Sequence, residues 1–367
     1  MRKLKIAQVA PLWFSIPPKK YGGIEWVVYN LCEGLTKLGH KVTLFASGDS
    51  KVPCKLIATV KKSLIEAGIS WQDPRYNLLN LTEAYKRAKE FDIIHTHVDL
   101  WEVFFAPLTK TVSLHTIHNP LYTDKDPKKD IRLQILKHFR DQNFVAISKS
   151  QKNLSAVKLN FVKVIYNGIR IEEFKFNPKP KDHFVWAARV DKYKGIENAI
   201  EIAKRAKVKL ILAGRLDPAQ KDYFEKSIKP KLTKDIKFIG EFSQKEKAKI
   251  YGEAKALLYP IEWHEPFGLN MVEAMACGTP VIAFKMGSVP EVVKDGKTGF
   301  VVETIEEAVE AVKEIGKIKR EDCRKWVEEN FTAEIMVKNY EKLYFELLKN
   351  ENTKNRKYFN SKNWREN

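Results

Sequence analysis

Apolar residues in this chain follow two patterns, short continuous runs and longer stretches in which they recur every three or four positions. The short runs predict buried strands, at residues 5–10, 41–45, 91–97, 111–118, 144–148 and 163–165, and then at 183–187, 209–213, 236–240, 256–259 and 281–284. Helical spacing separates or follows many of these runs, at residues 24–38, 128–142, 244–253, 303–312, 320–330 and 333–348. Strands that alternate with helices predict an α/β protein with two parallel sheets.

The stretch 256–284 places one strand–helix–strand unit next to candidate chemistry. Its helix is predicted to begin near Gly268 and to end at Cys277, because Gly278 and Pro280 stop a helix. The loop before the helix therefore lies at the carboxyl end of the sheet, where open α/β folds bind ligands.

Polar groups around the start of that helix favour a phosphate and a sugar. The free N–H groups of Gly268, Leu269 and Asn270 form the positive end of a helix dipole, which binds anions. Glu265 in the loop and Glu273 in the helix are suited to accept hydrogen bonds from sugar hydroxyls. Taken alone, such a pair of carboxylates also fits an ordinary surface loop and a solvated helix face.

Composition narrows the class of protein. The 367 residues are enough for two domains with separate cores. The four cysteines are widely spaced and include no CxxC pair, which argues against a zinc ribbon or a disulfide framework and fits a reducing cytoplasm. The net charge of +19 is compatible with nucleic acid, anionic lipid or a lysine-rich surface, but no nucleic-acid-binding signature is present. No stretch approaches the ~18 to 20 apolar residues of a membrane-spanning helix.

The run EPFGLNMVEAMACGTPVIAF at 265–284, followed by GSVPEVVKDGKTGFVV at 287–302, resembles the signature of the family 4 glycosyltransferases. These are retaining, nucleotide-sugar-dependent enzymes of the GT-B fold. The resemblance extends from Gly22 to about Asn330. It implies two Rossmann-like domains that face each other across a cleft, with a C-terminal helix that crosses back to the first domain.

The resemblance and the local composition together divide the chain. The expected parts are an acceptor-side domain at 1–168, a nucleotide-sugar-binding domain at 169–335, a crossover helix at 336–349 that packs on the first domain, and a disordered tail at 350–367. Three residues depart from the family pattern. Tyr166 and Arg170 replace the usual proline and aspartate at the turn between domains, and Arg215 replaces the acidic residue of a glycine-rich turn.

In the second domain, the resemblance assigns cations to the donor's diphosphate. Arg189 and Lys194, followed by Gly195, match the family's R-x4-KG motif. A guanidinium and an ammonium suit a pyrophosphate. The resemblance implies that both stabilise the departing diphosphate as catalytic residues, together with the donor-binding N–H groups of Leu269 and Asn270 beside Gly268.

The remaining donor contacts are also implied by the resemblance. Glu265 is expected to be catalytic, binding hydroxyls of the donor sugar and steadying positive charge at its anomeric carbon. Glu273 is expected to hold the ribose. The backbone at Ile239 and Gly240 is expected to hold the base.

In the first domain, the sequence YGGIE matches the glycine loop that reaches over the donor's diphosphate and borders the acceptor. Gly23 is expected on the donor side, and Gly22 and Glu25 on the acceptor side. His118 matches a histidine at the edge of the sugar pocket and is expected to contact distal hydroxyls as a catalytic residue. His97, near the end of a strand, is expected to line the cleft on the acceptor side.

Metal and cofactor follow from the same comparison. His95, His97 and Asp99 lie close together in sequence and would suit a metal cluster. The resemblance implies instead that no metal ion and no cofactor is needed, because GT-B enzymes hold the diphosphate with protein groups. The donor is expected to be a UDP- or GDP-sugar, and the acceptor a glycan, a lipid-linked molecule or a small molecule.

Residues 128–142 place Ile131, Ile135 and Phe139 on one helix face among basic residues. This pattern suits a helix packed on its own domain, and it equally suits a surface that rests on anionic lipid. A cytoplasmic protein is expected, with peripheral contact at the inner membrane surface as an open alternative.

The predicted function is hexosyl transfer to an acceptor hydroxyl with retention of configuration, in glycan, glycolipid or envelope polysaccharide synthesis. Two other enzymes on the same fold are the first alternatives, a nucleotide-sugar epimerase and a phosphorylase. A non-catalytic protein that binds a nucleotide sugar or a nucleic acid is the other alternative, although nucleic acid is not the expected partner.

Overall fold

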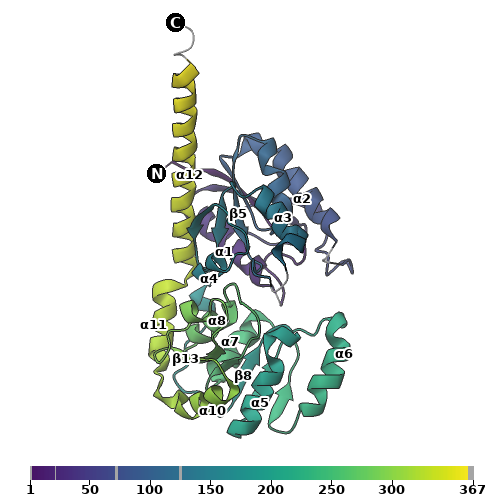
Figure 1. The fold of residues 1–367 in the computed structure, drawn as a ribbon, viewed down its shortest axis with the longest axis vertical. Coiled ribbons are helices and arrows are strands. Elements are labelled where there is room, and N and C mark those ends of the chain that lie inside the picture. Colours follow the sequence, from purple (N-terminus) through teal and green to yellow (C-terminus); the bar gives the residue numbers. More distant parts are fainter. Residues whose placement is uncertain (1, 21, 71–72, 124–125, 363–367) are drawn as a thin grey trace.

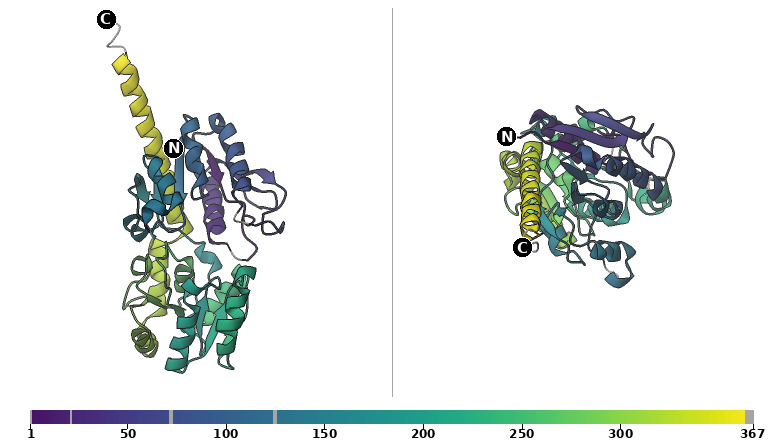
Figure 2. Two further views of the ribbon diagram at one scale, coloured as in Figure 1. Left: turned by 45° about the vertical axis from the view of Figure 1, so that its right-hand side comes forward. Right: turned by 90° about the horizontal axis from the view of Figure 1, so that it is seen from above.

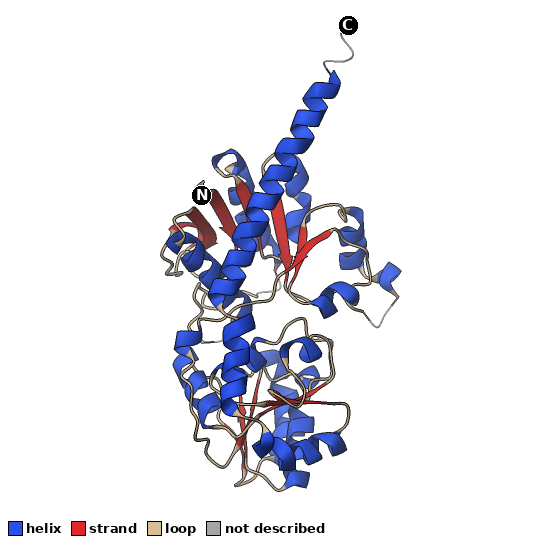
Figure 3. Cartoon of the chain, turned by 90° about the vertical axis from the view of Figure 1, so that its left-hand side faces the viewer, coloured by secondary structure: helices blue, strands red, loops and turns tan. Residues whose placement is uncertain are grey.

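The computed structural model describes residues 2–20, 22–70, 73–123 and 126–362, and side chains up to residue 350. Two α/β domains lie end to end along the longest axis (Figure 1). Each domain has its own sheet, and the last helix runs alongside the first domain (Figure 3). The predicted fold class of two Rossmann-like domains is therefore confirmed.

The first domain is built on a seven-stranded parallel sheet in the order β3-β2-β1-β4-β5-β6-β7. Its strands are β1 (Lys5–Val9), β2 (Lys41–Ser47), β3 (Lys55–Val60), β4 (Ile93–Thr96), β5 (Val112–Ile117), β6 (Phe144–Ala146) and β7 (Phe161–Val164). Its helices are α1 (Gly23–Lys37), α2 (Pro74–Lys86), α3 (Ile131–His138) and α4 (Lys149–Asn153). The strand order reverses between β1 and β4, so the loops after these strands form the ligand-binding crevice.

The second domain repeats this plan with six parallel strands in the order β10-β9-β8-β11-β12-β13. Its strands are β8 (Phe184–Ala187), β9 (Leu210–Ala213), β10 (Ile236–Phe238), β11 (Leu257–Tyr259), β12 (Val281–Phe284) and β13 (Gly299–Val302). Its helices are α5 (Ile196–Ala206), α6 (Lys221–Tyr223), α7 (Gln244–Glu253), α8 (Leu269–Ala276), α9 (Val289–Val292), α10 (Ile305–Glu314) and α11 (Arg320–Asn330). Its crevice lies after β8 and β11.

The chain passes between the domains twice, at adjacent positions. Ile169 pairs with Thr332 in a parallel bridge, and the Ile169 N–H donates to the Phe331 carbonyl at 2.9 Å. Gly168 lies so close to the second crossing that a Cβ there would be 2.3 Å from the Thr332 carbonyl oxygen. The two crossing segments are therefore packed directly against each other.

Helix α12 (Ala333–Lys362) returns to the first domain. Its buried residues join the core that contains α1 and β1, and they are Met336, Val337, Tyr340, Leu343, Tyr344 and Leu347. The helix continues past the predicted end of the crossover segment at 349 (Figure 2). The disordered tail expected at 350–367 is thus corrected over 350–362, where no glycine or proline stops the helix; residues 363–367 lie outside the described residues.

Among the elements that the apolar pattern does not predict are β3, β13 and α2. The outer strand β3 is half exposed, so its pattern is weak, and β13 contains a glycine. Helix α2 begins at Pro74 after an Asp73 cap and carries many polar residues. These elements cover the periphery of the domains, and the central strands that support the cavity between the domains all match predicted runs.

Helix α3 corrects the helix predicted at 128–142. Leu133 and Leu136 are the fully buried residues, whereas the side chain of Ile131 is 74% exposed. Ile135 and Phe139 are half buried against the same cluster. The predicted face is therefore split, because the helix rotates to bury Leu133 and Leu136 and leaves Ile131 in solvent.

Candidate active site

A cavity of about 390 Å³ lies between the two domains. The first domain contributes the loop after β1, the start of α1 and the end of β5. The second domain contributes the loops after β8, β9 and β11 and the start of α8. Predicted site residues that line it are Gly22, Gly23, Glu25, His118, Arg189, Lys194, Glu265, Gly268, Leu269, Asn270 and Glu273.

The loop that carries Glu265 is held by backbone contacts from a neighbouring loop. The Ser288 N–H donates to the Glu265 carbonyl at 2.9 Å, and Ser288 Oγ donates to the Phe267 carbonyl at 2.8 Å. Gly287 has a φ of 57°, and a Cβ there would lie 2.4 Å from the Glu265 backbone nitrogen. Glycine at 287 is thus required for this approach.

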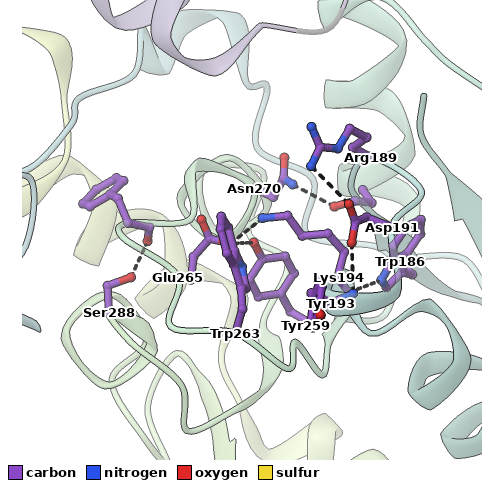
Figure 4. Close-up of polar contacts among 12 residues, drawn as sticks. Trp186, Arg189, Asp191, Tyr193, Lys194, Tyr259, Trp263, Glu265, Asn270 and Ser288 are labelled. Carbon is purple, nitrogen blue, oxygen red and sulfur yellow. Dashed lines mark hydrogen bonds and ion pairs between the residues drawn. The ribbon is translucent and has the colours of Figure 1, made fainter. Parts of the chain in front are cut away.

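Three side chains converge on the Glu265 carboxylate (Figure 4). Its Oε2 accepts hydrogen bonds from Lys194 Nζ and Tyr259 Oη, each at 2.8 Å, and from Trp263 Nε1 at 2.9 Å. Lys194 Nζ also lies 3.9 Å from the centre of the Trp263 ring. Burial raises the pKa of Glu265, but the Lys194 ammonium and the hydrogen bonds outweigh burial and lower it overall. Glu265 is therefore a buried, charged carboxylate.

The loop after β8 aims Arg189 and Lys194 into the cavity. The Trp186 Nε1 donates to the Lys194 carbonyl at 2.9 Å and anchors the turn. Gly195 has a φ of 70°, and a Cβ there would lie 1.9 Å from the Pro260 carbonyl oxygen, so this turn packs on the end of β11. Arg189 Nη2 pairs with Asp191 at 3.2 Å, and its side chain is 32% exposed. Both cations remain within reach of a ligand.

Glu273 has a lysine partner that the sequence does not reveal. Lys247 Nζ donates to both carboxylate oxygens of Glu273, each at 2.7 Å. Burial raises the pKa of Glu273, and the Lys247 charge opposes this rise without cancelling it. Lys247 also lines the cavity, and it lies in the first turn of α7 after the Ser243–Glu246 capping box. The capping box predicts where α7 begins. It does not predict that the Lys247 side chain reaches Glu273, because Glu273 lies on another helix, α8.

Across the cavity, the start of α1 faces the start of α8. A Cβ on Gly23 would lie 3.5 Å from the Leu269 Cδ1, so the two helix N-termini approach each other closely. Both termini present positive dipole ends to the same space. Glu25 lies in the first turn of α1 with 2% of its surface exposed, and burial raises its pKa to about 8. Its Oε1 has no hydrogen-bond partner among the described residues.

His118 follows β5 and is held by the carboxylate of Asp99. The backbone N–H of His118 donates to Asp99 Oδ1 at 2.7 Å. His118 lines the cavity, and burial lowers its pKa to about 3, so the ring is neutral at physiological pH. The site thus joins a charged wall in the second domain to a neutral histidine in the first.

Comparison with known proteins places this architecture in a family. Residues 169–332 match the family described as glycosyl transferases group 1, and residues 21–173 match glycosyltransferase family 4. The two matches together span both walls of the cavity. The chain belongs to the family 4 glycosyltransferases.

Relatives of this glycosyltransferase cover nearly its whole length. It is 27% identical to an uncharacterised glycosyltransferase of Methanocaldococcus jannaschii, over 81% of this chain and 84% of the relative. It is 24% identical to the lipopolysaccharide 1,2-N-acetylglucosaminetransferase of Salmonella typhimurium, over 82% and 85%. The structure of Anabaena HepE with UDP-glucose has a TM-score of 0.71 at 18% identity, covering 94% of this chain and all (100%) of that one. This last similarity shows a shared GT-B fold.

Two groups of predicted site residues of the glycosyltransferase lie away from the cavity. His97 is fully buried behind His118 and does not reach the cavity wall, because its ring nitrogens bond to His118 and Gln8. Ile239 and Gly240 also lie outside the lining residues, although the adjoining Glu241 and Phe242 do line the cavity.

The acceptor-side expectation for His97 is therefore corrected to a supporting position. His97 directly follows β4, and its position two residues from His95 does not show whether it reaches the cavity. The structure decides this, because the His97 ring is held between Gln8 on β1 and His118 after β5.

Asn270 and the suggested metal ligands have partners within the protein. Asn270 Nδ2 donates to the Ala187 carbonyl at 2.7 Å, which ties α8 to β8. His95 bonds to Tyr344 and Thr116, and Asp99 accepts backbone N–H groups. Among the residues described, no three His, Cys, Asp or Glu side chains form a group suited to a metal ion. In the same residues, no helix combines the length and apolar character needed to cross a membrane.

Proposed function

We propose that this glycosyltransferase moves a hexosyl group from a UDP- or GDP-sugar to an acceptor hydroxyl with retention of anomeric configuration. The observation that carries the proposal is the convergence of Arg189, Lys194 and the N-terminus of α8 on one cavity. Preorganised cations and N–H groups stabilise negative charge that grows on a leaving diphosphate. Anabaena HepE, which has a similar fold, was solved in complex with UDP-glucose, and this supports the same class of donor.

The lysine pairs suggest how the donor enters. Lys194 neutralises Glu265 and Lys247 neutralises Glu273, so neither buried carboxylate is left uncompensated before a ligand arrives. An entering diphosphate competes with Glu265 for the Lys194 ammonium. Glu265 then accepts hydrogen bonds from sugar hydroxyls and steadies positive charge at the anomeric carbon, while Glu273 accepts from the ribose.

The first domain supplies groups for the sugar and the acceptor. His118 contacts distal hydroxyls of the donor sugar. In the second domain, the backbone beside Ile239 and Gly240, next to the lining residues Glu241 and Phe242, borders the base. On the acceptor side, Glu25 Oε1 and Trp26 Nε1 belong to residues that line the cavity, and neither atom has a hydrogen-bond partner among the described residues. Such buried polar atoms favour a hydroxyl-rich acceptor, because an unmade hydrogen bond is costly.

A thermal-shift screen of UDP-, GDP- and ADP-sugars tests the donor. A ligand at a hundred times its dissociation constant adds ~2.7 kcal/mol of stability. The same screen on Lys194→Ala and on Lys192→Ala, an exposed lysine of the same turn, provides the matched control. Stabilisation lost in Lys194→Ala alone supports the site, and no stabilisation of the wild type by any of these donors overturns it. The anomeric configuration of the product, read by NMR, tests retention.

We also propose that the first domain rests on anionic lipid, which would bring the cavity to a lipid-linked or envelope acceptor at the inner membrane surface. Ile131, the first residue of α3, is exposed, and the 41% exposed Phe104 packs edge-on against Phe139 at the end of that helix. The exposed Lys128 and Lys129 precede the helix, and Lys137 lies in its last turn. Each basic residue near an anionic surface contributes about 1 kcal/mol.

Co-sedimentation with vesicles of phosphatidylserine and phosphatidylcholine tests this surface. Changing Lys128, Lys129 and Lys137 to Gln is expected to weaken sedimentation, whereas changing Lys226, Lys234 and Lys237 in the second domain is not. Arg132 is left intact because its Nη1 donates to the Pro120 carbonyl at 2.7 Å. Equal sedimentation with purely neutral vesicles would contradict the electrostatic attraction, and tighter binding to duplex DNA at the same salt would favour nucleic acid instead.

A further inference from the structure

A chain of buried hydrogen bonds connects the crossover helix α12 to the wall of the cavity. Tyr344 on α12 accepts from Gln8 Nε2 on β1 at 3.0 Å. Gln8 Oε1 lies 3.0 Å from His97 Nε2, and His97 Nδ1 lies 2.9 Å from His118 Nε2. Tyr344, Gln8 and His97 are completely buried, and only His118 reaches the cavity.

The direction of each bond follows from the chemistry of the groups. Gln8 Oε1 can only accept, so His97 must carry its proton on Nε2. Burial lowers the pKa of His97 well below its usual value, so its Nδ1 is an unprotonated acceptor. His118 must then donate from Nε2. The neutral ring of His118 therefore has a lone pair on Nδ1.

That lone pair has no partner among the residues that the structure describes. His118 Nδ1 makes no hydrogen bond to any described residue, and the side chain lines the cavity beside Asn119. It can accept a hydrogen bond from a ligand hydroxyl but cannot donate one. A carboxylate or carbonyl oxygen at that position would face a lone pair and be disfavoured.

We propose that Tyr344, Gln8 and His97 are positioning residues that hold His118 in the tautomer protonated on Nε2, so that its Nδ1 accepts a hydroxyl of the donor sugar. The assignment of the sugar to this face rests on the proposed function, whereas the tautomer does not. The relay ties sugar recognition to α12, the helix by which the chain returns from the second domain to the first. It also names a donor class, hexoses with a free hydroxyl at this position, in preference to hexuronates.

The structure provides a matched pair of variants. Tyr344 and Tyr340 lie one turn apart on α12, and both are completely buried. Tyr344 Oη bonds to Gln8 and to His95, whereas Tyr340 Oη bonds to Thr116, which reaches Tyr344 only through His95. Tyr344→Phe and Tyr340→Phe thus remove the same hydroxyl at equal burial. Only the first frees the Gln8 amide to turn over, which reverses the donors and acceptors at His97 and His118.

Two measurements on the full-length protein test the relay. In protein labelled with ¹⁵N-histidine, the wild type is expected to show His118 as one tautomer, with Nε2 protonated and Nδ1 not. Tyr344→Phe is expected to shift both His118 nitrogens toward intermediate values, and Tyr340→Phe to leave them unchanged. A protonated Nδ1 in the wild type, or equal behaviour of the two variants, overturns the proposal.

The second measurement is the affinity for UDP-glucose and GDP-mannose, each compared with UDP or GDP alone. Tyr344→Phe is expected to weaken the sugar nucleotide about three- to tenfold, the worth of one hydrogen bond, and to leave the nucleotide unchanged. Weakening of both by the same factor overturns the link to the sugar. If the His118 resonances respond and sugar binding does not, the relay is confirmed and the sugar contact proposed for His118 is the part that fails.

Discussion

The two walls of the cavity bury different kinds of polar group. The second domain buries charges and pairs them, Lys194 with Glu265 and Lys247 with Glu273. The first domain buries groups that are neutral at pH 7, His118 and Glu25, whose pKa values are about 3 and about 8. Of the described lining residues on that side, Lys20 is the one with a permanent charge.

This difference follows the chemistry that each wall would face. A diphosphate carries charge that increases as its bond to the sugar breaks, and buried cations stabilise it. Sugar and acceptor hydroxyls are neutral, and they are recognised by aligned donors and acceptors without the desolvation cost of an ion. The four predictions below test whether the contrast between a charged wall and a neutral wall holds, beginning with the largest effect.

Removing one partner of a buried pair should affect the charged wall most. Lys247→Met leaves Glu273 buried without its cation, and we expect a loss of ~3 kcal/mol in the free energy of unfolding, measured with denaturant. The double variant Lys247→Met with Glu273→Gln should recover most of that stability, because no unpaired charge remains. A double variant as unstable as the single one would show that Lys247 acts through packing.

Removing a cation that faces the diphosphate should slow transfer. We expect Arg189→Ala and Lys194→Ala each to lower kcat by ~10²-fold or more, as deletion of an oxyanion donor does. Lys192→Ala, in the same turn, is the control. Turnover close to that of wild type in both cavity variants would remove the diphosphate from this wall.

The neutral wall should make the stability of the protein depend on pH. Glu25 has a folded pKa of about 8, against an ordinary value of 4.5. Its contribution to the free energy of unfolding is therefore fully present below pH 4.5 and is lost as the pH rises to 8. Relative to Glu25→Gln, the wild type should lose on the order of 1.4 kcal/mol per pH unit within this window. Parallel unfolding curves for the two proteins between pH 5 and 8 would mean that Glu25 is ionised when folded.

A chelator should have the smallest effect. If protein cations alone hold the diphosphate, transfer should persist in excess EDTA at an unchanged rate. A strict requirement for added Mn²⁺ or Mg²⁺, measured after removal of bound metal, would show that the charged wall is incomplete without a cation.

Local sequence patterns predict much of the fold. Helices α7 and α11 match their predicted bounds to the residue. Helix α7 begins at a capping box and shows helical spacing, and α11 is predicted from its helical spacing alone. Glu265 and Lys194 are likewise found from motifs that combine a loop with the end of a strand. The tail was predicted less well. Its polar composition indicated disorder, but the preceding helix continues to Lys362 because no stop signal follows it.

Only the tertiary structure decides which polar groups meet. Glu265 and Lys194 are 71 positions apart, and Gln8 and Tyr344 are 336 apart, so no spacing rule connects them. The same is true of Lys247, whose partner lies on another helix, and of His97, which packing places behind His118. The sequence by itself determined the strands, helices and motif residues, because periodicity and capping act over a few residues. The charge states, partners and tautomers were decided by burial, which exists only once the two domains and α12 have packed together.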